Sequence, residues 1–179
     1  MSLIELEKQS QLDQSYWIAS TEDTNYPALN KNITVDIAIV GAGIVGIATA
    51  YQLLNSGMSI ALFDGDRIAQ ATTGHTTAKV TSQHGLIYAQ LISRFGRELA
   101  QQYATANEFV IKELKTIADQ NNIDCDYTSL PAFVFTQDQN YVQQIKDEVE
   151  AAKSLGISAS FVEQIPFSMQ IKAGIRFDN

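Results

Sequence analysis

The chain of 179 residues has a single cysteine, Cys125, and only 3 prolines. One cysteine excludes an internal disulfide and cannot by itself hold a structural zinc ion or an iron–sulfur cluster. We therefore expect a reducing compartment, most simply the cytoplasm, and no protein-held metal in this stretch. The scarcity of proline, with 10 glycines and 45% apolar residues, is typical of a globular protein rather than a disordered or collagen-like one.

Basic residues are also few, since 12 Lys and Arg stand against 20 Asp and Glu, for a net charge of -8. A nucleic-acid-binding surface needs clustered basic residues to neutralise phosphates, and an anionic membrane attracts the same charges. We expect neither partner. The acidic excess is concentrated in residues 98–163. This is the pattern of a solvated helical surface, with a docking patch for another protein as the alternative.

No apolar run is long enough to span a bilayer. The longest, from Val35 to Ala50, is shorter than the roughly 20 residues that a membrane helix needs, and it contains Asp36. The polar residues up to Ser15 lack the basic and apolar regions of a secretory signal. The run is better explained as a buried strand, a turn and a helix.

These elements begin a strand–helix–strand unit. Val35–Val40 has the length and β-branched content of a strand, Ile44–Asn55 has apolar residues at helical spacing, Gly57 ends the helix, and Ser59–Asp64 is the next strand. Such a unit implies a right-handed crossover and two parallel strands. The predicted fold class is therefore α/β, with a Rossmann-like βαβ unit followed by helices and short strands that begin a second, substrate-type region.

The rest of the chain divides into further predicted elements. A leader with a short helix and an extended arm precedes Asn32, and a polar, threonine-rich loop runs from Gly65 to Gly85. The later elements are a helix over Leu86–Gln120 interrupted near Phe95-Gly96, strands at Cys125–Tyr127 and Ala132–Thr136, a helix over Gln139–Leu155 that ends at Gly156, and a strand at Ser158–Val162.

The length is enough for one domain, or for one domain and the start of another, at roughly 100 to 200 residues per domain. We predict a leader arm at 1–32, a dinucleotide-binding Rossmann-like region at 33–125, and the start of a substrate or cap region at 126–179. The last residues, Ile175–Asn179, look like a strand without a closing element, which predicts a truncated chain. An unpaired edge would favour self-association.

The strongest chemical signal is GAGIVG at 41–46, between the first predicted strand and the helix. Gly41 permits the tight turn, Gly43 lets a pyrophosphate approach the backbone, and Gly46 allows close helix–strand packing. The helix N-terminus offers free N–H groups to the phosphates. Asp64, at the end of the second strand, can accept hydrogen bonds from ribose hydroxyls. The alternative is an ordinary glycine turn beside an ordinary strand-end carboxylate.

NAD and FAD both bind to this combination of glycine turn, helix N-terminus and strand-end acid, so other residues must distinguish them. The threonine-rich loop is not needed by a nicotinamide-dependent dehydrogenase and favours FAD. Six segments, one of which contains the glycine turn, together match the sequence pattern of a known family. They are Ser15-Tyr16-Trp17, Asp36–Gly46, Asp64–Ile68, Thr72–Thr81, Gln83-His84-Gly85 and Asn122–Asp126. With them, most of the chain resembles the FAD-dependent oxidoreductases of the D-amino-acid oxidase, glycine oxidase and sarcosine oxidase superfamily. The detailed pattern is similar to a bacterial branch whose flavin and substrate domains are followed by a C-terminal Rieske 2Fe-2S domain.

The resemblance implies roles for individual residues. It assigns the pyrophosphate to the glycine turn, the adenosine ribose to Asp64, the neighbourhood of the adenosine to Arg67, and the path beneath the isoalloxazine to the threonine-rich loop. Ala71 departs from the family, which often has glycine there. The implied cofactor-binding residues are Gly41, Gly43, Ile44, Val45, Gly46, Asp64, Arg67, Thr72, Thr73, Thr77 and Ala78, with Lys79 near them.

His75 has two interpretations. In dimethylglycine-type relatives, a histidine in a similar loop position tethers the flavin covalently through its 8α carbon, and a deprotonated imidazole can serve as that nucleophile. The alternative, which we favour for His84 as well, is a loop residue that makes hydrogen bonds. Lys79 either places a positive charge near the flavin ring or faces solvent. The sequence assigns no catalytic residue, because one cysteine and two histidines form no nucleophile arrangement.

We therefore predict the FAD-binding N-terminal part of a flavoprotein oxidoreductase that takes a hydride from an amine or amino-acid-like C–H donor. Electrons would be passed on, in the intact protein to a Rieske 2Fe-2S centre that this chain does not contain. The chain alone is expected to be inactive. Two alternatives remain open at this point: a non-catalytic dinucleotide-binding or protein-docking module, and an NAD-dependent dehydrogenase.

Overall fold

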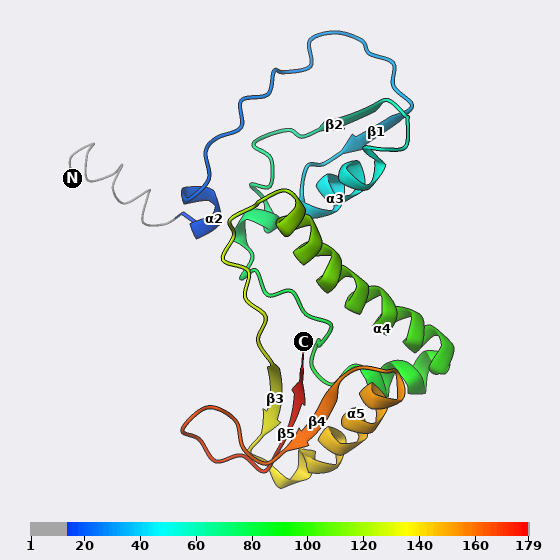
Figure 1. The fold of residues 1–179 in the computed structure, drawn as a ribbon, viewed down its shortest axis with the longest axis vertical. Coiled ribbons are helices and arrows are strands. Elements are labelled where there is room, and N and C mark those ends of the chain that lie inside the picture. The colour runs from blue at the N-terminus through cyan, green and yellow to red at the C-terminus, as the bar shows by residue number, and fades with distance from the viewer. Residues whose placement is uncertain (1–13, 179) are drawn as a thin grey trace, which may run out of the picture. The chain divides into compact units, whose positions relative to one another are not determined.

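The computed structural model describes residues 14–178. It divides the chain into two compact units, Met1–Lys79 and Val80–Asn179, which are considered separately below. Figure 1 shows the elements of each unit along the chain.

The first unit contains the predicted strand–helix–strand arrangement. Strand β1 (Ile37–Val40) leads through helix α3 (Ile44–Leu53) to strand β2 (Ile60–Phe63). The two strands pair in parallel, with Ile37 opposite Ile60. This confirms the α/β class and the parallel βαβ unit. A single helical turn, α2 (Tyr16–Ala19), precedes them, and the arm from 21 to 35 has no regular structure (Figure 1).

Helix α3 forms where its apolar spacing predicts, but several of its apolar side chains are exposed. Ile44, Val45 and Ile47 are exposed, and Gly46 is the helix's buried residue. The reason is geometric, because the two-stranded sheet of this unit is much narrower than the five or six strands of an average sheet.

The threonine-rich segment is a loop, as predicted, with one short 3₁₀ turn, η1 (Thr72–His75). Further along it, Ala78 adopts the left-handed conformation with φ of 56°. Left-handed backbone is uncommon for a residue with a Cβ atom.

The second unit begins with a long helix, α4 (Tyr88–Gln120), that is broken at Gly96. Gly96 has φ of 80° and ψ of 164°, which confirms the interruption predicted near Phe95-Gly96. The remaining elements are strand β3 (Ala132–Thr136), the 3₁₀ turn η2 (Gln139–Tyr141), helix α5 (Val142–Ser154), and strands β4 (Ala159–Val162) and β5 (Ala173–Phe177).

One sequence prediction for this unit is wrong. Residues Cys125–Tyr127 do not form a strand, because Asp126 has φ of 52° and cannot continue extended backbone. The strand-like residues near the end of the chain belong to β5. β5 is the central strand of an antiparallel sheet with the order β3-β5-β4, so hydrogen bonds join it to a neighbour on each side.

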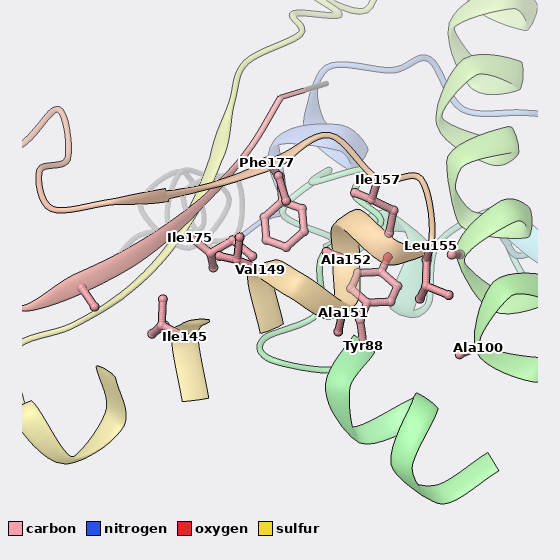
Figure 2. Packing of buried hydrophobic residues seen from close by; sticks show 13 residues of the cluster. Tyr88, Ala100, Ile145, Val149, Ala151, Ala152, Leu155, Ile157, Ile175 and Phe177 are labelled. Carbon is pink, nitrogen blue, oxygen red and sulfur yellow. The ribbon is translucent and has the colours of Figure 1, made fainter. Parts of the chain in front are cut away.

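The core of the second unit lies between this sheet and the two helices. Figure 2 shows Ile175 and Phe177 from β5 beside Val149 and Ala152 from α5, and the Tyr88 ring of α4 lies 6.5 Å from the Phe177 ring. Burial of these side chains stabilises the unit through the hydrophobic effect. Within residues 14–178, no helix combines the length and apolar character needed to cross a membrane.

Candidate functional site

The glycine turn between β1 and α3 is as tight as its sequence predicts. Gly41 has φ of 102°, and its amide donates to the Phe63 carbonyl at the end of β2 over 2.7 Å. A Cβ atom on Gly46 would lie 1.9 Å from the Gly41 carbonyl oxygen. No side chain could be accommodated at 46 without moving the backbone, so both glycines have a structural reason to be there.

The N-terminus of α3 meets the threonine-rich loop. The Ile44 amide donates to Thr73 Oγ1 over 2.9 Å, and a Cβ atom on Gly43 would lie 3.3 Å from the same oxygen. Among the described residues, no acceptor is found for the neighbouring Val45 amide, and the Val45 side chain is exposed. A threonine hydroxyl and an open helix N-terminus thus lie together, and both can hydrogen-bond an anion.

Asp64 joins the end of β2 to the same turn. Its Oδ2 accepts from the Ala42 amide over 2.6 Å, and its Oδ1 accepts from the Asp66 amide over 3.1 Å. The Ala42 hydrogen bond is the main reason that the pKa of Asp64 lies below its ordinary value, with the Asp66 amide adding to the effect. The exposed carboxylate is therefore ionised at neutral pH and keeps acceptor capacity for ribose hydroxyls.

A cavity of about 1080 Å³ opens beside Asp64. Its walls include Asp23, Thr24 and residues 26–31 of the leader arm, the end of β2 at Leu62 and Phe63, and Asp64, Asp66 and Arg67 just after it. All of these residues belong to the first unit. The volume is at the upper end of that typical for small-molecule and cofactor sites.

Arg67 turns toward the leader. Its guanidinium donates to the carbonyl oxygens of Ile18 and Thr21 and pairs with the Asp23 carboxylate over 3.1 Å. The family resemblance predicts that Arg67 lies beside the adenosine, and Arg67 lines the cavity next to Asp64. Its polar contacts, however, go to backbone carbonyls and side chains of the leader.

The other predicted loop residues do not all converge on the glycine turn. The His75 ring nitrogen Nδ1 lies 2.9 Å from the Ala71 carbonyl oxygen, which is the loop hydrogen bond of the favoured interpretation. The Ala78 amide donates to Thr76 Oγ1. Thr72, Thr77 and Lys79 are exposed, and Thr73 is the member of this predicted set that hydrogen-bonds to the turn.

The sequence does not predict the contacts between the leader and the threonine-rich loop. Trp17 Nε1 donates to the Thr76 carbonyl over 2.8 Å, and a Cβ atom on Gly74 would lie 3.0 Å from the Ile18 side chain. The Ser15-Tyr16-Trp17 segment contributes to the family resemblance, but no pattern in it indicates what those residues touch. Among residues 14–178, no three His, Cys, Asp or Glu side chains gather as a metal site requires.

A parallel strand–helix–strand unit with a tight glycine turn, an open helix N-terminus and an ionised carboxylate at the second strand is the arrangement of the dinucleotide-binding class. Residues 36–177 match the family model described as FAD dependent oxidoreductase (DAO). The chain belongs to this family.

Curated proteins of known sequence extend the comparison. The chain is 37% identical over 166 residues to a putative Rieske 2Fe-2S iron-sulfur protein, YhfW, of Bacillus subtilis, a match that covers 93% of this chain and 33% of that protein. It is 24% identical over 130 residues to gamma-glutamylputrescine oxidoreductase of Escherichia coli, covering 70% of this chain and 30% of that protein. The chain thus spans about a third of the length of these relatives.

Among solved structures, the chain is similar to L-amino acid deaminase from Proteus vulgaris. A form of that enzyme lacking its specific insertion sequence aligns with a TM-score of 0.60 and 19% identity, over 88% of this chain and 40% of that chain. At this identity the similarity supports the fold.

Proposed function

We propose that this chain binds FAD and forms the cofactor-holding part of a flavoprotein oxidoreductase. The observation that carries the proposal is the convergence of Asp64, the Ala42–Ile44 turn and Thr73 on one helix N-terminus. Gly41, Gly43, Ile44, Val45 and Gly46 would hold the pyrophosphate, aided by the Thr73 hydroxyl. Asp64 would bind the adenosine ribose.

The remaining predicted residues of the threonine-rich loop would lie along the bound cofactor. Thr72, His75, Thr77 and Ala78 would line its path toward the flavin, and Lys79 would lie near the ring. When bound, FAD supplies a ring system that accepts a hydride from a C–H bond. The chain's own contribution is to bind and orient the dinucleotide through backbone N–H groups, one hydroxyl and one carboxylate.

For the intact protein we propose an amine or an amino-acid-like substrate. The family and the names of two similar proteins, which mention gamma-glutamylputrescine and L-amino acid, support this class. Residues 126–179 would begin the substrate region. The similarity to a protein named for a Rieske 2Fe-2S centre supports such a centre as the electron acceptor, located outside this chain.

An absorption spectrum tests FAD binding directly. The purified protein is measured as isolated and again after FAD addition and desalting. We expect retained flavin absorbance for the wild type and for Thr73→Ser, which keeps the hydroxyl, and weaker retention for Thr73→Val, which removes it. A protein that never retains flavin, in this chain and in a longer form, would overturn the proposal. Binding of NADH in its place would support a nicotinamide-dependent dehydrogenase.

Acid precipitation tests the attachment of the flavin. Because His75 Nδ1 is occupied by the Ala71 carbonyl, Nε2 is the ring nitrogen free to react. Flavin colour that stays in the acid pellet of the wild type and moves to the supernatant in His75→Asn would establish covalent attachment. Colour in the supernatant for both proteins would leave His75 as a loop residue.

A further inference from the structure

The Arg67 side chain binds the leader arm, and most of its N–H donors are used in doing so. Nη1 donates to Ile18 O over 3.2 Å, and Nη2 donates to Thr21 O over 3.0 Å and to Thr21 Oγ1 over 2.8 Å. Nε forms the ion pair with Asp23. The Arg67 side chain is only 17% exposed. A planar guanidinium with several fixed donors suits this task, because it can bond several carbonyls and a carboxylate at once.

The arm that Arg67 holds is one wall of the cavity beside Asp64. The arm continues from Asp23 to Lys31 along that cavity, and Figure 1 shows the segment between α2 and β1 as a long arc in blue. The cavity is lined on this side by Tyr26, Pro27 and Leu29, which contribute an aromatic ring and apolar surface. Tyr26 is 72% exposed and Leu29 is 58% exposed, so this apolar surface is open to a ligand.

The same anchor reaches the loop that carries Thr73. Ile18 packs against Gly74, and Trp17 hydrogen-bonds to Thr76, both within three residues after Thr73, which meets the helix N-terminus. The leader is thus attached both to the cavity wall and to the loop of the proposed pyrophosphate site.

We infer that the arm at 23–31 encloses the adenosine half of the cofactor, with Tyr26 against the adenine face, and that Arg67 is a positioning residue that acts through the arm. The inference rests on the proposed function, because Asp64 identifies the adenosine end of the cavity. An aromatic ring beside an adenine base is a favourable stacking partner. Arg67 therefore contributes to cofactor affinity without bonding the cofactor.

Two measurements test this inference on the intact protein stripped of flavin. The first is the FAD dissociation constant, obtained from the change in the fluorescence of FAD itself as it binds. The second is the rate of tryptic cleavage after Lys31, which lies in the arm and lines the cavity. In the wild type we expect FAD and ADP to slow this cleavage, and FMN, which lacks adenosine, to leave it unchanged.

Two variants separate the arm from its anchor. Arg67→Met should free the arm, and Tyr26→Ser should leave the anchor intact while removing the ring. We expect each to weaken FAD binding by about tenfold or more, equivalent to about 1.4 kcal/mol. Arg67→Met should also speed cleavage after Lys31 in the absence of ligand. The matched control is Arg176→Met, which removes an arginine paired with Asp178 in the second unit and should change neither measurement.

The outcomes distinguish this inference from the proposed function. Wild-type affinity in both Arg67→Met and Tyr26→Ser, with FAD still bound, would overturn the role of the arm and leave the flavoprotein proposal standing. Protection of Lys31 by FMN as well as by ADP would also overturn it. A wild type that binds neither FAD nor ADP would overturn the proposed function and the inference together.

Discussion

The carboxylate of Glu148, on α5, accepts a hydrogen bond from the backbone amide of Tyr88, the first residue of α4, over 2.8 Å. Its second oxygen accepts from the Ala89 amide over the same distance. The arrangement is reciprocal, because Gln101 on α4 donates to the Leu155 carbonyl at the end of α5. Each helix thus caps a terminus of the other, which fixes how the two pack in the second unit.

Loss of the Glu148 cap should destabilise this unit. Glu148→Ala leaves two amides without their acceptor, and one of them, on Tyr88, is buried, so we expect a loss on the order of 2 kcal/mol. Urea unfolding followed by far-UV circular dichroism measures it. Glu150→Ala, at an exposed position of the same helix, is the control and should change stability by no more than about 0.5 kcal/mol. Equal effects of the two variants would contradict the capping role.

The Glu148 site should also make stability depend on pH. Burial raises the pKa of Glu148 above its ordinary value, and the Ala89 and Tyr88 amides only partly oppose this. Because the folded-state pKa exceeds the unfolded one, the group's contribution is present below the unfolded pKa and is lost as pH rises through the folded pKa. The stability of the wild type relative to Glu148→Gln should therefore fall with rising pH just above the ordinary glutamate range. A constant difference would contradict this.

Gly46 should be the least replaceable residue of the glycine turn. Because an added Cβ would lie 1.9 Å from the Gly41 carbonyl oxygen, Gly46→Ala must shift the turn, and we expect FAD retention to be abolished. Gly65→Ala is the control, since a Cβ there meets no atom within 4 Å. Desalting after FAD addition, with circular dichroism to verify folding, gives the result. Equal retention by both variants would show that the close approach is not needed.

Asp64 should make the stability of the first unit fall at acidic pH. The Ala42 and Asp66 amides hold the pKa of Asp64 below its ordinary value, so its contribution is present above the unfolded pKa and is lost as pH falls through the folded pKa. Melting curves followed by Trp17 fluorescence, taken between roughly pH 5 and pH 2, should show the wild type losing its advantage over Asp64→Asn. Parallel pH profiles of the two proteins would contradict the role of the carboxylate.

Because the backbone at Ala78 is left-handed, the stability of the protein should depend on which residue stands at this position. With φ of 56°, Ala78→Gly removes a steric cost, whereas Ala78→Val adds one because a β-branched side chain is poorly accommodated there. We expect Ala78→Val to be less stable than Ala78→Gly by about 1–2 kcal/mol. Melting followed by Trp17 fluorescence measures the gap. Equal stability would mean that the loop changes conformation in the valine variant.

The features that were predicted correctly depend on short-range chemistry. The parallel βαβ unit follows from two β-branched runs on either side of a helix with a glycine turn, and the break at Gly96 follows from a residue that accepts positive φ. The end of α5 before Gly156, with φ of 80°, has the same origin. Prediction failed at Cys125–Tyr127, where apparent strand residues surround a left-handed Asp126.

By itself, the sequence determined the location of the glycine turn, the acid that follows it, the threonine-rich loop and most helices and strands, because each depends on residues close together in the chain. Tertiary structure alone decided the partners of those elements. Arg67 bonds Ile18 at a separation of 49 residues, Trp17 bonds Thr76 at 59, and Glu148 caps Tyr88 at 60. Likewise, only the packed sheet shows that β5 lies between β3 and β4. Periodicity and turn chemistry describe a few neighbouring residues, whereas these contacts arise when the folded chain brings distant donors and acceptors together.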